Sequence, residues 1–345
     1  MHIHGGDIYL NKNVTDFSAN INFKGTPDSV KAAAKAGVDL SDQYPDINCE
    51  ELRLSIGASE HIPAQQVICG NGASELIFSL ALAIKPVQAL LMAPTFYEYQ
   101  QALSSVGCEL IKYRMKEERG FALQEDFLEK IQKSTDIIFL CNPNNPTGVL
   151  TETEFLEKVL RRCERCNTLL VVDECFNPFL ENPEQYTMKH YLKSSEHLII
   201  LKAFTKIYAM AGLRLGYVLT NNAGVAHRMS QVTQPWNVSI PAQMAGIAAL
   251  KEEGFLKDTR KELKAEKEFL QKGLAKIGYP ILGSKANYIF FQGPRTLYSD
   301  CLEREFLIRD CSNYEGLPGG WYRIAVKGRK ENEALLNVLH VIKGT

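Results

Sequence analysis

The sequence has neither an excess of charge of one sign nor a long hydrophobic run. Its 345 residues include 39 Lys and Arg against 40 Asp and Glu, so nothing points to a polybasic surface for nucleic acid or for an anionic membrane. The longest apolar runs, 76–84 and 87–93, are too short to cross a bilayer, and no secretory signal is recognisable near the first residue. We therefore expect a cytoplasmic protein whose partners are small molecules or proteins.

The sequence also lacks the residue spacing of a zinc site. Its nine cysteines are scattered along the chain, which favours reduced thiols over a disulfide framework. Cys163 and Cys166 form one C-x-x-C pair, but no second Cys or His pair at zinc spacing accompanies it. We therefore expect no metal. Internal repeats and low-complexity segments are absent as well.

The order of apolar and polar segments predicts an α/β fold. Apolar residues make up 45% of the chain and charged residues 23%, as is usual for a globular protein. Short apolar runs alternate with helix-length segments such as 74–84 and 152–166, which is typical of a mostly parallel sheet covered by helices. The strand candidates are 66–69, 89–92, 109–114, 137–141, 168–172, 198–202 and 216–219.

The pattern changes beyond residue 240. Residues 251–276 are strongly charged, with apolar residues at spacings of three and four, which predicts a long helix with one packed and one solvated face. Two more strand candidates, 287–292 and 321–326, follow this helix. We predict three parts, which are an N-terminal arm of residues 1–26, a large domain of residues 27–240 and a smaller α/β domain of residues 241–345.

In open parallel sheets, ligands bind at the carboxyl ends of the strands, so the loops after the strands carry the functional argument. The first such loop is 69–75, CGNGASE, between a strand candidate and a helix candidate. Gly70 and Gly72 would let the backbone approach an anion, and the start of a helix favours a phosphate there. The loop is neither a dinucleotide fingerprint nor a Walker loop, and a tight turn with Ser74 as the helix cap explains it equally well.

Two more loops place polar residues directly after strand candidates. Residues 141–148, CNPNNPTG, combine two X-Pro steps with asparagines, so a fixed turn would present side-chain amides at the sheet edge. Asp173 ends an apolar strand candidate, where a carboxylate is costly unless it faces a cation or a donor, or caps a helix. Both loops are therefore candidates for ligand contacts.

A fourth loop lies within residues 202–217, KAFTKIYAMAGLRLGY, which contain two lysines four residues apart. A lysine desolvated among apolar residues has a shifted pKa and forms Schiff bases, and Arg214 is suited to bind a phosphate. These residues alone do not choose between Lys202 and Lys206, and both could instead reach solvent along the protein surface. Taken together, the four loops describe a site for a phosphorylated aromatic aldehyde, and pyridoxal phosphate matches that description.

The same stretches resemble a known family, the pyridoxal-phosphate enzymes of the aspartate-aminotransferase fold, also called fold type I or class I and II aminotransferases. The order GNGASE, NPNNPTG, VVDE and TKIYAMAGLRLGY, followed by YRIAV, is similar to this family over almost the whole chain. The resemblance implies a large domain with a seven-stranded, mostly parallel sheet, a smaller C-terminal domain and a homodimer.

The resemblance also implies roles for single residues. Lys206, eight residues before Arg214, would form the Schiff base with pyridoxal phosphate, Asp173 would pair with the ring nitrogen, and Asn145 would bond the phenolic oxygen. Phe176 stands where many aminotransferases have a tyrosine that bonds the same oxygen. Phe96 would stack on the ring. The remaining contacts would come from Gly72, Ala73, Ser74, Thr205, Arg214 and, across the dimer interface, Tyr44.

Two subgroups of this family compete. The core motifs are similar to those of histidinol-phosphate aminotransferases, whereas HGGD at 4–7, DFSANIN at 16–22 and LIRDCSNYEGL at 307–317 are similar to threonine-phosphate decarboxylases of cobalamin biosynthesis. We favour decarboxylation of L-threonine O-3-phosphate to (R)-1-aminopropan-2-yl phosphate, with transamination between 2-oxoglutarate and glutamate as the alternative. The resemblance implies that the arm folds over the active site and that the substrate is bound by His4, Asn145, Arg309 and Arg323.

Overall fold

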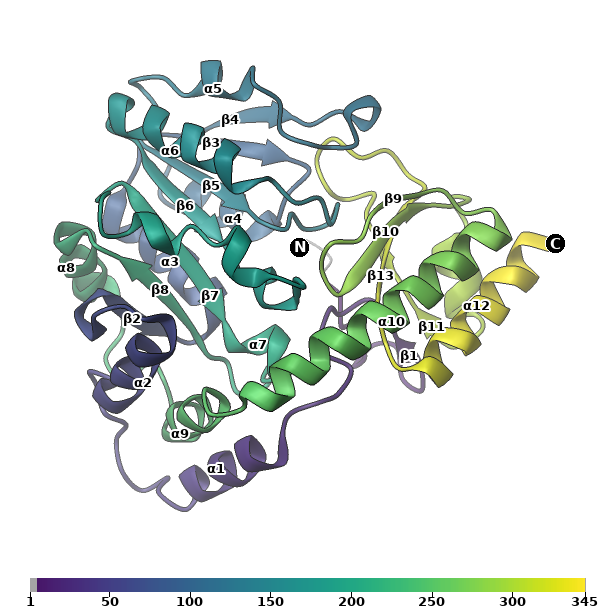
Figure 1. Cartoon of the computed structure of the whole chain (residues 1–345), viewed down its shortest axis with the longest axis horizontal. Helices are drawn as coiled ribbons and strands as arrows, with labels where there is room; N and C mark the ends of the chain where they lie inside the picture. Colours follow the sequence, from purple (N-terminus) through teal and green to yellow (C-terminus); the bar gives the residue numbers. More distant parts are fainter. Residues whose placement is uncertain (1–4, 345) are drawn as a thin grey trace.

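A seven-stranded sheet organises the larger part of the computed structural model, which describes residues 5–344 (Figure 1). Strand β8 runs antiparallel to both of its neighbours, and the other pairs are parallel. The predicted mostly parallel sheet is therefore confirmed. In spatial order the strands are β2 (Val67–Gly70), β8 (Gly216–Thr220), β7 (Leu198–Ala203), β6 (Leu169–Asp173), β5 (Ile137–Cys141), β3 (Gln88–Ala93) and β4 (Glu109–Arg114).

Helices cover both faces of this sheet, so its central strands are apolar on both sides. Leu91 and Phe139 pack on the face that lies under α3, α4 and α8, whereas Leu90 and Ile138 pack on the opposite face, under α6. This alternation follows from the two-residue period of a strand. The helices named here are α3 (Gly72–Ile84), α4 (Tyr97–Ser105), α6 (Thr153–Cys166) and α8 (Ala223–Val232).

Helix α6 explains the C-x-x-C pair without a metal. Leu156, Val159, Leu160 and Cys163 recur at helical spacing and are all buried, and Cys166 is buried one turn further on. Across residues 5–344, no group of His, Cys, Asp or Glu is arranged to hold a metal ion. All nine cysteines of the sequence lie in this range as buried free thiols.

A smaller antiparallel sheet lies beside the large one (Figure 1). The predicted charged helix is present as α10 (Glu253–Ile277), which packs against the C-terminal helix α12 (Arg329–Gly344). Near the start of the chain, β1 (Thr15–Asp16) pairs in parallel with β11 (Phe306–Leu307) in a separate two-stranded sheet. The next residue, Phe17, accepts a backbone hydrogen bond from Ala325 at the end of β13, which links the N-terminal segment to the smaller sheet. The strands of the smaller sheet are β12 (Arg309–Asp310), β13 (Trp321–Ala325), β10 (Tyr288–Gln292) and β9 (Ile281–Gly283).

The remaining helices connect these layers. Helix α9 packs against α1 and α2 beside the large sheet, whereas the short helix α7 directly continues strand β7. The division into an arm and two domains at residues 26 and 240 stays a prediction. The helices not yet given are α1 (Asp28–Val38), α2 (Glu50–Glu60), α5 (Phe127–Lys130), α7 (Phe204–Ile207), α9 (Ile240–Ala249) and α11 (Leu297–Leu302).

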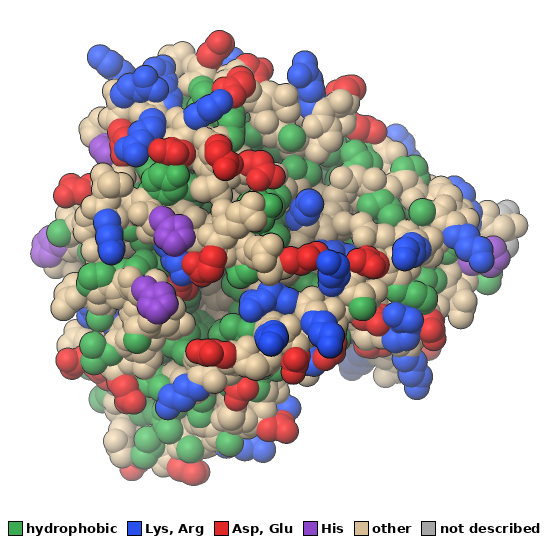
Figure 2. All heavy atoms as spheres, viewed as in Figure 1, with side chains coloured by type: hydrophobic (Ala, Val, Ile, Leu, Met, Phe, Trp, Pro, Cys, Tyr) green, Lys and Arg blue, Asp and Glu red, His purple; other side chains and the backbone are tan. Residues whose placement is uncertain are grey.

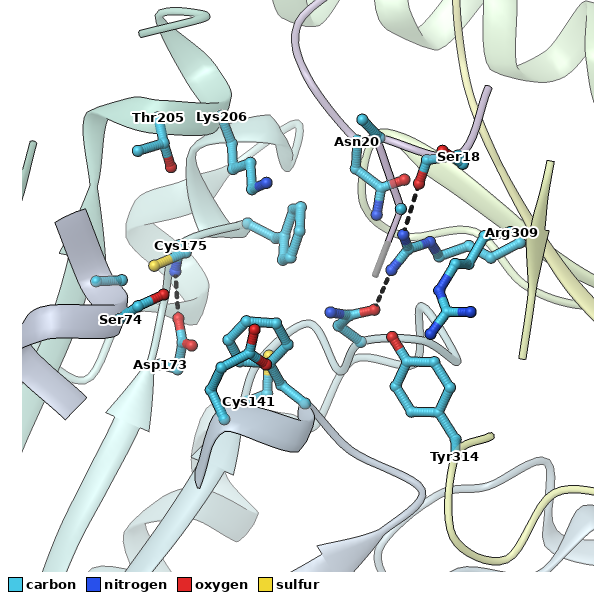
Figure 3. A pocket seen from close by; sticks show the side chains of 18 of the residues that line it. Ser18, Asn20, Ser74, Cys141, Asp173, Cys175, Thr205, Lys206, Arg309 and Tyr314 are labelled. Atoms are coloured by element: carbon cyan, nitrogen blue, oxygen red, sulfur yellow. Dashed lines mark hydrogen bonds between the residues drawn. The ribbon is translucent and has the colours of Figure 1, made fainter. Parts of the chain in front are cut away.

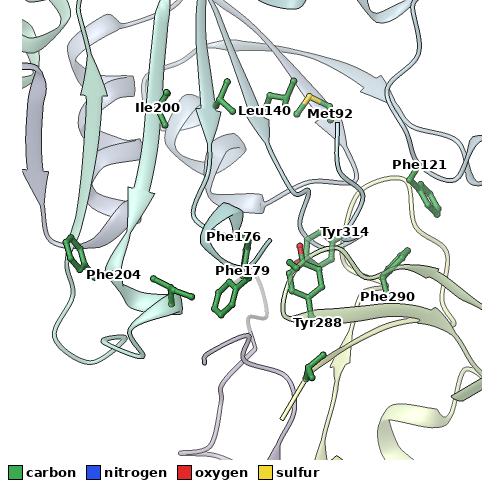
Figure 4. Close-up of a cluster of buried hydrophobic side chains, with 14 of the residues drawn as sticks. Met92, Phe121, Leu140, Phe176, Phe179, Ile200, Phe204, Tyr288, Phe290 and Tyr314 are labelled. Atoms are coloured by element: carbon green, nitrogen blue, oxygen red, sulfur yellow. The ribbon is translucent and has the colours of Figure 1, made fainter. Parts of the chain in front are cut away.

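One buried cluster joins the two sheets (Figure 4). Met92 and Leu140 come from the large sheet, Tyr288 and Phe290 come from the smaller one, and Phe176 lies between them. The ring of Phe176 meets that of Tyr288 edge-on, with centroids 5.1 Å apart. Because this core is shared, the loops at the ends of the large-sheet strands are held against the smaller sheet.

The surface agrees with the balanced composition. On the face drawn in Figure 2, acidic and basic side chains are interspersed rather than gathered into a patch of one sign. Within residues 5–344, no helix combines the length and the apolar character that crossing a membrane requires.

Candidate active site

A cavity of about 250 Å³ lies where the loops of the large sheet meet the smaller sheet (Figure 3). Strand β8 is antiparallel to β7, so β8 begins at the edge of the sheet where β5, β6 and β7 end. Arg214 comes two residues before β8 and therefore lies beside the loops that follow these strands. The predicted residues that line the cavity are Ala73, Ser74, Phe96, Asn145, Asp173, Thr205, Lys206, Arg214, Arg309 and Arg323.

The cavity has two ends (Figure 3). Ser74, Asp173, Thr205 and Lys206 lie at one end, on the loops of the large sheet, and Arg309 lies at the other. Of the other predicted residues, Gly72 and Tyr44 do not line this cavity, and the Tyr44 side chain is 77% exposed. His4 lies outside the described residues. The roles of these residues stay predictions.

Gly72 and Arg214 build a cradle at the start of α3. The helix begins at Gly72 with Asn71 at its N-cap, so Ser74 lies in the first turn and does not cap the helix. Gly72 has a φ of +80°, and a Cβ atom there would lie 2.6 Å from Arg214 Nη2. Glycine therefore lets the guanidinium lie against the helix start, where free N–H groups and the helix dipole favour an anion.

The structure separates the two lysines of the fourth loop. Lys202 is buried in β7, and its ammonium donates to both oxygens of Glu60, at 2.7 and 2.9 Å. Lys206 lies in α7 and faces the cavity, and no residue in the described range 5–344 accepts a hydrogen bond from its Nζ. Burial lowers the pKa of Lys206, and the positive charges of Arg323 and Arg214 lower it further. Lys206 therefore has the properties of a nucleophilic amine.

Asp173 ends β6 with its carboxylate buried at the cavity wall. Tyr99 donates a hydrogen bond to Oδ2 at 2.5 Å, and the amide of Cys175 donates to Oδ1 at 2.9 Å. Burial raises the pKa of Asp173, while these donors oppose that rise. A carboxylate in this position can bond a protonated ring nitrogen.

Asn145 is oriented by the smaller sheet. Arg323 on β13 donates to Asn145 Oδ1 from Nη1 and to the Ser18 carbonyl from Nη2, the latter at 2.8 Å. With Oδ1 engaged, the donor Nδ2 of Asn145 is the group that remains for a ligand. Arg323 thereby links the turn after β5, the N-terminal segment and the smaller sheet.

Arg309 lies at the opposite end of the cavity, and an unexpected acid also lines the wall. Arg309 on β12 donates to Asn313 Oδ1 at 2.8 Å, and its guanidinium lies 5.1 Å from the ring centre of Tyr314. Glu98 on α4 also lines this cavity, and burial raises its pKa to about 7. Lys206 and Arg309 oppose that rise. Among residues 5–344, four basic and two acidic side chains thus line the cavity, which suits an anionic ligand.

Two polar atoms of the cavity wall lack hydrogen-bond partners within residues 5–344. They are the donor Nε of Arg323 and the acceptor Oδ1 of Asn20. Buried polar groups are nearly always bonded in folded proteins, so an unbonded donor and an unbonded acceptor in one wall indicate a place for a ligand. These atoms lie apart from the cradle at α3, so they belong to a second part of the ligand site.

The residues present match the requirements of pyridoxal phosphate. The cradle of Gly72, Ser74, Thr205 and Arg214 would hold the phosphate, and Lys206 would bind the aldehyde carbon. Phe176 lines the wall but offers no hydroxyl, so Asn145 would be the donor to the phenolic oxygen. The unpaired atoms of Arg323 and Asn20 would remain for the substrate.

Sequence reasoning missed several residues of this site. Ser18, Asn20 and Tyr314 lie within the stretches DFSANIN and LIRDCSNYEGL, so a signal for them existed. Glu98 and Cys175 gave no such signal, because an acid in a helix and a cysteine after a strand are ordinary residues.

Comparison with known proteins agrees with this geometry. The sequence model for aminotransferases of class I and II matches residues 12–341. A threonine-phosphate decarboxylase from Salmonella typhimurium is 36% identical over 330 residues, which cover 94% of this chain and 90% of that protein. A histidinol-phosphate aminotransferase from Methanosphaera stadtmanae is 28% identical, over 96% of this chain and 91% of that protein. The solved structure of a histidinol-phosphate aminotransferase from Clostridium acetobutylicum superposes with a TM-score of 0.89 at 28% identity, over 95% of this chain and 98% of that one.

Proposed function

Because the chain belongs to the class I and II aminotransferase family, whose enzymes depend on pyridoxal phosphate, we propose that it decarboxylates a phosphorylated amino acid, L-threonine O-3-phosphate. The product would be (R)-1-aminopropan-2-yl phosphate, formed for cobalamin biosynthesis. The observation that carries the proposal is the pair Arg309 and Arg323, which line the cavity in addition to the cradle at α3. A substrate with both a phosphate and a carboxylate needs two such cations. The 36% identity to a threonine-phosphate decarboxylase supports the same substrate.

The residues of the large sheet would hold the cofactor. Arg214, Ser74 and Thr205 would bind its phosphate, Phe96 would pack on its ring, and Asp173 would bond its ring nitrogen. When bound, pyridoxal phosphate withdraws electrons from the bond at the substrate α-carbon that is aligned with its conjugated ring. The reaction therefore depends on how the protein orients the substrate.

Arg309 and Arg323 would orient the substrate. Two nitrogens of Arg323 are already bonded to Asn145 and to Ser18, so the guanidinium cannot turn freely, and Nε remains for an anion. Together the two arginines would neutralise the substrate phosphate and carboxylate. Decarboxylation requires that the bond from the α-carbon to the carboxylate be aligned with the conjugated ring of the cofactor. Aminotransfer requires that the bond from the α-carbon to its proton be aligned instead.

Lys206 would supply the proton that completes the reaction. When the bond between the α-carbon and the carboxylate carbon breaks, carbon dioxide leaves without the bonding electron pair, which stays on the side of the α-carbon and must form a new bond there to a proton. Burial and the neighbouring arginines lower the pKa of Lys206, so its Nζ releases a proton more readily than an exposed lysine does. No keto acid takes part in this sequence of steps.

We also propose that the enzyme is a cytoplasmic homodimer. Tyr44 is 77% exposed, and its ring stacks on that of Trp236 at 4.4 Å. Val38, Ile47 and Leu54 are exposed apolar side chains on α1, on α2 and on the segment between them. In a dimer, Tyr44 would reach the cofactor phosphate of the partner subunit. Analytical ultracentrifugation should find a dimer. The Tyr44→Phe variant should bind the cofactor more weakly and should remain a dimer.

A second candidate function is aminotransfer between histidinol phosphate and 2-oxoglutarate. The close superposition with a histidinol-phosphate aminotransferase structure supports it. Both candidates need the same cofactor contacts, so the products distinguish them. The purified protein, incubated with threonine phosphate and no keto acid, should convert this substrate to aminopropanol phosphate. Phosphorus NMR spectroscopy of the mixture would detect the product. If the phosphorylated substrate stays unchanged until 2-oxoglutarate is added, the decarboxylase proposal is wrong.

A further inference from the structure

Asp173 is held from behind by donors that the proposed reaction does not use. The hydroxyl of Tyr99 donates to Oδ2 at 2.5 Å, and the amide of Cys175 donates to Oδ1 at 2.9 Å. The side chain of Cys175 also favours the charged form of this carboxyl, because it lowers the pKa of Asp173. All three residues are buried, and Tyr99 is fully inaccessible to solvent. The carboxylate is therefore bonded on both oxygens before any ligand is present.

Tyr99 also supports the residue expected to pack on the cofactor ring. Its ring stacks on Phe139 with centroids 5.0 Å apart, and Phe96 meets it edge-on at 5.5 Å. Phe96 and Tyr99 are three residues apart at the start of α4, so they lie on the same side of its first turn. One helical turn thus carries both a wall of the cavity and the donor to Asp173.

The electrostatics of this group favour a charged Asp173. Burial raises the pKa of Tyr99 and of Cys175, and the adjacent Asp173 raises both further. The hydroxyl and the thiol therefore keep their protons at neutral pH, and the hydroxyl donates to Asp173. Burial alone would favour the neutral form of Asp173, whereas donors to its oxygens favour the carboxylate.

We propose that Tyr99 and Cys175 are positioning residues that keep Asp173 ionised, so that a carboxylate faces the ring nitrogen of the cofactor. Without these donors, the buried carboxylate would become a stronger base and would draw the proton from the ring nitrogen to itself. A ring nitrogen without its proton withdraws electrons less strongly. The proposal concerns the cofactor contact alone, so it holds for decarboxylation and for aminotransfer alike.

The test compares variants that remove one donor at a time. Tyr99→Phe removes the hydroxyl and keeps the ring between Phe139 and Phe96, whereas Cys175→Ala removes the thiol and Cys175→Ser restores a donor. The chain offers a matched control in Tyr113, whose hydroxyl donates to Asp126 at the same 2.5 Å, outside the cavity. Tyr113→Phe therefore removes a tyrosine-to-aspartate hydrogen bond of the same length that lies outside the cavity.

The measurements need no substrate. The holoenzyme is prepared with pyridoxal phosphate labelled with ¹⁵N in the ring, and the nitrogen chemical shift reports whether this atom is protonated. The dissociation constant of the cofactor is measured by absorbance titration. For Tyr99→Phe, we expect the signal to move toward the position of an unprotonated pyridine and the dissociation constant to rise about tenfold, as for the loss of a hydrogen bond to a charged group. Cys175→Ala should give a smaller change in the same direction, and Cys175→Ser should restore the wild-type signal.

Two results would overturn the proposal. One is a Tyr99→Phe protein with the wild-type nitrogen shift and cofactor affinity. The other is a Tyr113→Phe protein that shifts as much as Tyr99→Phe, because the effect would then reflect general destabilisation. Wild-type values for Tyr113→Phe beside the expected change in Tyr99→Phe would support it.

Discussion

Lys202 donates hydrogen bonds to both carboxylate oxygens of Glu60, at 2.7 and 2.9 Å, inside the protein. Although burial disfavours its charged form, the Glu60 carboxylate raises the pKa of Lys202, so this lysine stays an ammonium ion and cannot act as a nucleophile. Lys206, four residues later, faces the cavity, and its pKa is lowered by burial and by the nearby arginines. The two lysines therefore differ in their partners, because Lys202 is paired with Glu60 and Lys206 faces the cavity.

The first prediction follows from this difference. Lys206→Arg should abolish the yellow, borohydride-reducible adduct with pyridoxal phosphate, because the guanidinium is not a nucleophile at neutral pH. Lys202→Arg makes the same chemical change and should keep the adduct, since an arginine can still pair with Glu60. Absorbance spectra before and after borohydride, with mass spectrometry of the labelled peptide, check both variants. A reducible adduct in the Lys206→Arg protein would refute the assignment.

The second prediction concerns stability and pH. Burial opposes ionisation of Glu60, but Lys202 and Tyr217 lower its pKa from 4.5 to about 2. A group with a lowered folded-state pKa stabilises the protein above its unfolded-state pKa, and this stabilisation is lost as the pH falls toward the folded-state value. Glu60→Gln should therefore lower the free energy of unfolding by about 3 kcal/mol at neutral pH, and the difference should shrink between about pH 4.5 and about pH 2.

Denaturant unfolding at several pH values measures this difference. Glu125 provides the control, because it pairs with Lys158 at 2.7 Å in an exposed ion pair. Glu125→Gln should cost no more than about 0.5 kcal/mol. A difference between wild type and Glu60→Gln that stays constant down to the acid limit would contradict the account.

The sequence allowed much of this architecture to be predicted, because the signals are local. All seven strand candidates are present, since apolar runs bounded by turns determine strands that are covered on both faces. The meeting of the four loops at one cavity was also predictable, because each loop carries its polar residues next to a strand end. The helix predicted over 74–84 begins at Gly72, two residues earlier than expected.

Contacts between distant residues could not be predicted in the same way. Glu60 and Lys202 are 142 residues apart, and the hydroxyl of Tyr99 meets Asp173 across 74 residues. In the sequence, Tyr99 is one more aromatic residue of a helix, and Glu98 looks like a solvated acid. Only the packing of α4 against the strand ends places Glu98 in the cavity wall and the Tyr99 hydroxyl beside Asp173.

The third prediction tests the phosphate cradle. Gly72→Ala should displace the Arg214 guanidinium, because the added Cβ would lie 2.6 Å from its Nη2, and it should weaken cofactor binding about tenfold. Gly107 is the matched control, since its φ of +77° is nearly the same and a Cβ there would meet no atom within 4 Å. Gly107→Ala should strain the backbone equally and leave cofactor affinity unchanged. Equal losses of affinity in the two variants would show that backbone strain, and not the guanidinium, is responsible.

The fourth prediction concerns Glu98. Burial raises the pKa of this carboxyl to about 7, so it is neutral below that pH and negatively charged above it. The negative charge should repel an anionic substrate, so the KM for threonine phosphate should rise about fivefold as the pH increases through 7, equivalent to about 1 kcal/mol. Glu98→Gln should flatten this dependence, and Glu118→Gln, at an exposed position outside the cavity, should not. An unaltered pH profile in Glu98→Gln would remove Glu98 from substrate recognition.

The reaction itself is tested most directly with threonine phosphate labelled with ¹³C in its carboxylate. The purified holoenzyme is supplied with this substrate in the presence and in the absence of 2-oxoglutarate, and labelled carbon dioxide and glutamate are measured. We predict one labelled carbon dioxide for each aminopropanol phosphate formed, with no dependence on 2-oxoglutarate and no glutamate. Turnover that requires 2-oxoglutarate, yields glutamate and leaves the label in the phosphorylated product would contradict the proposed function.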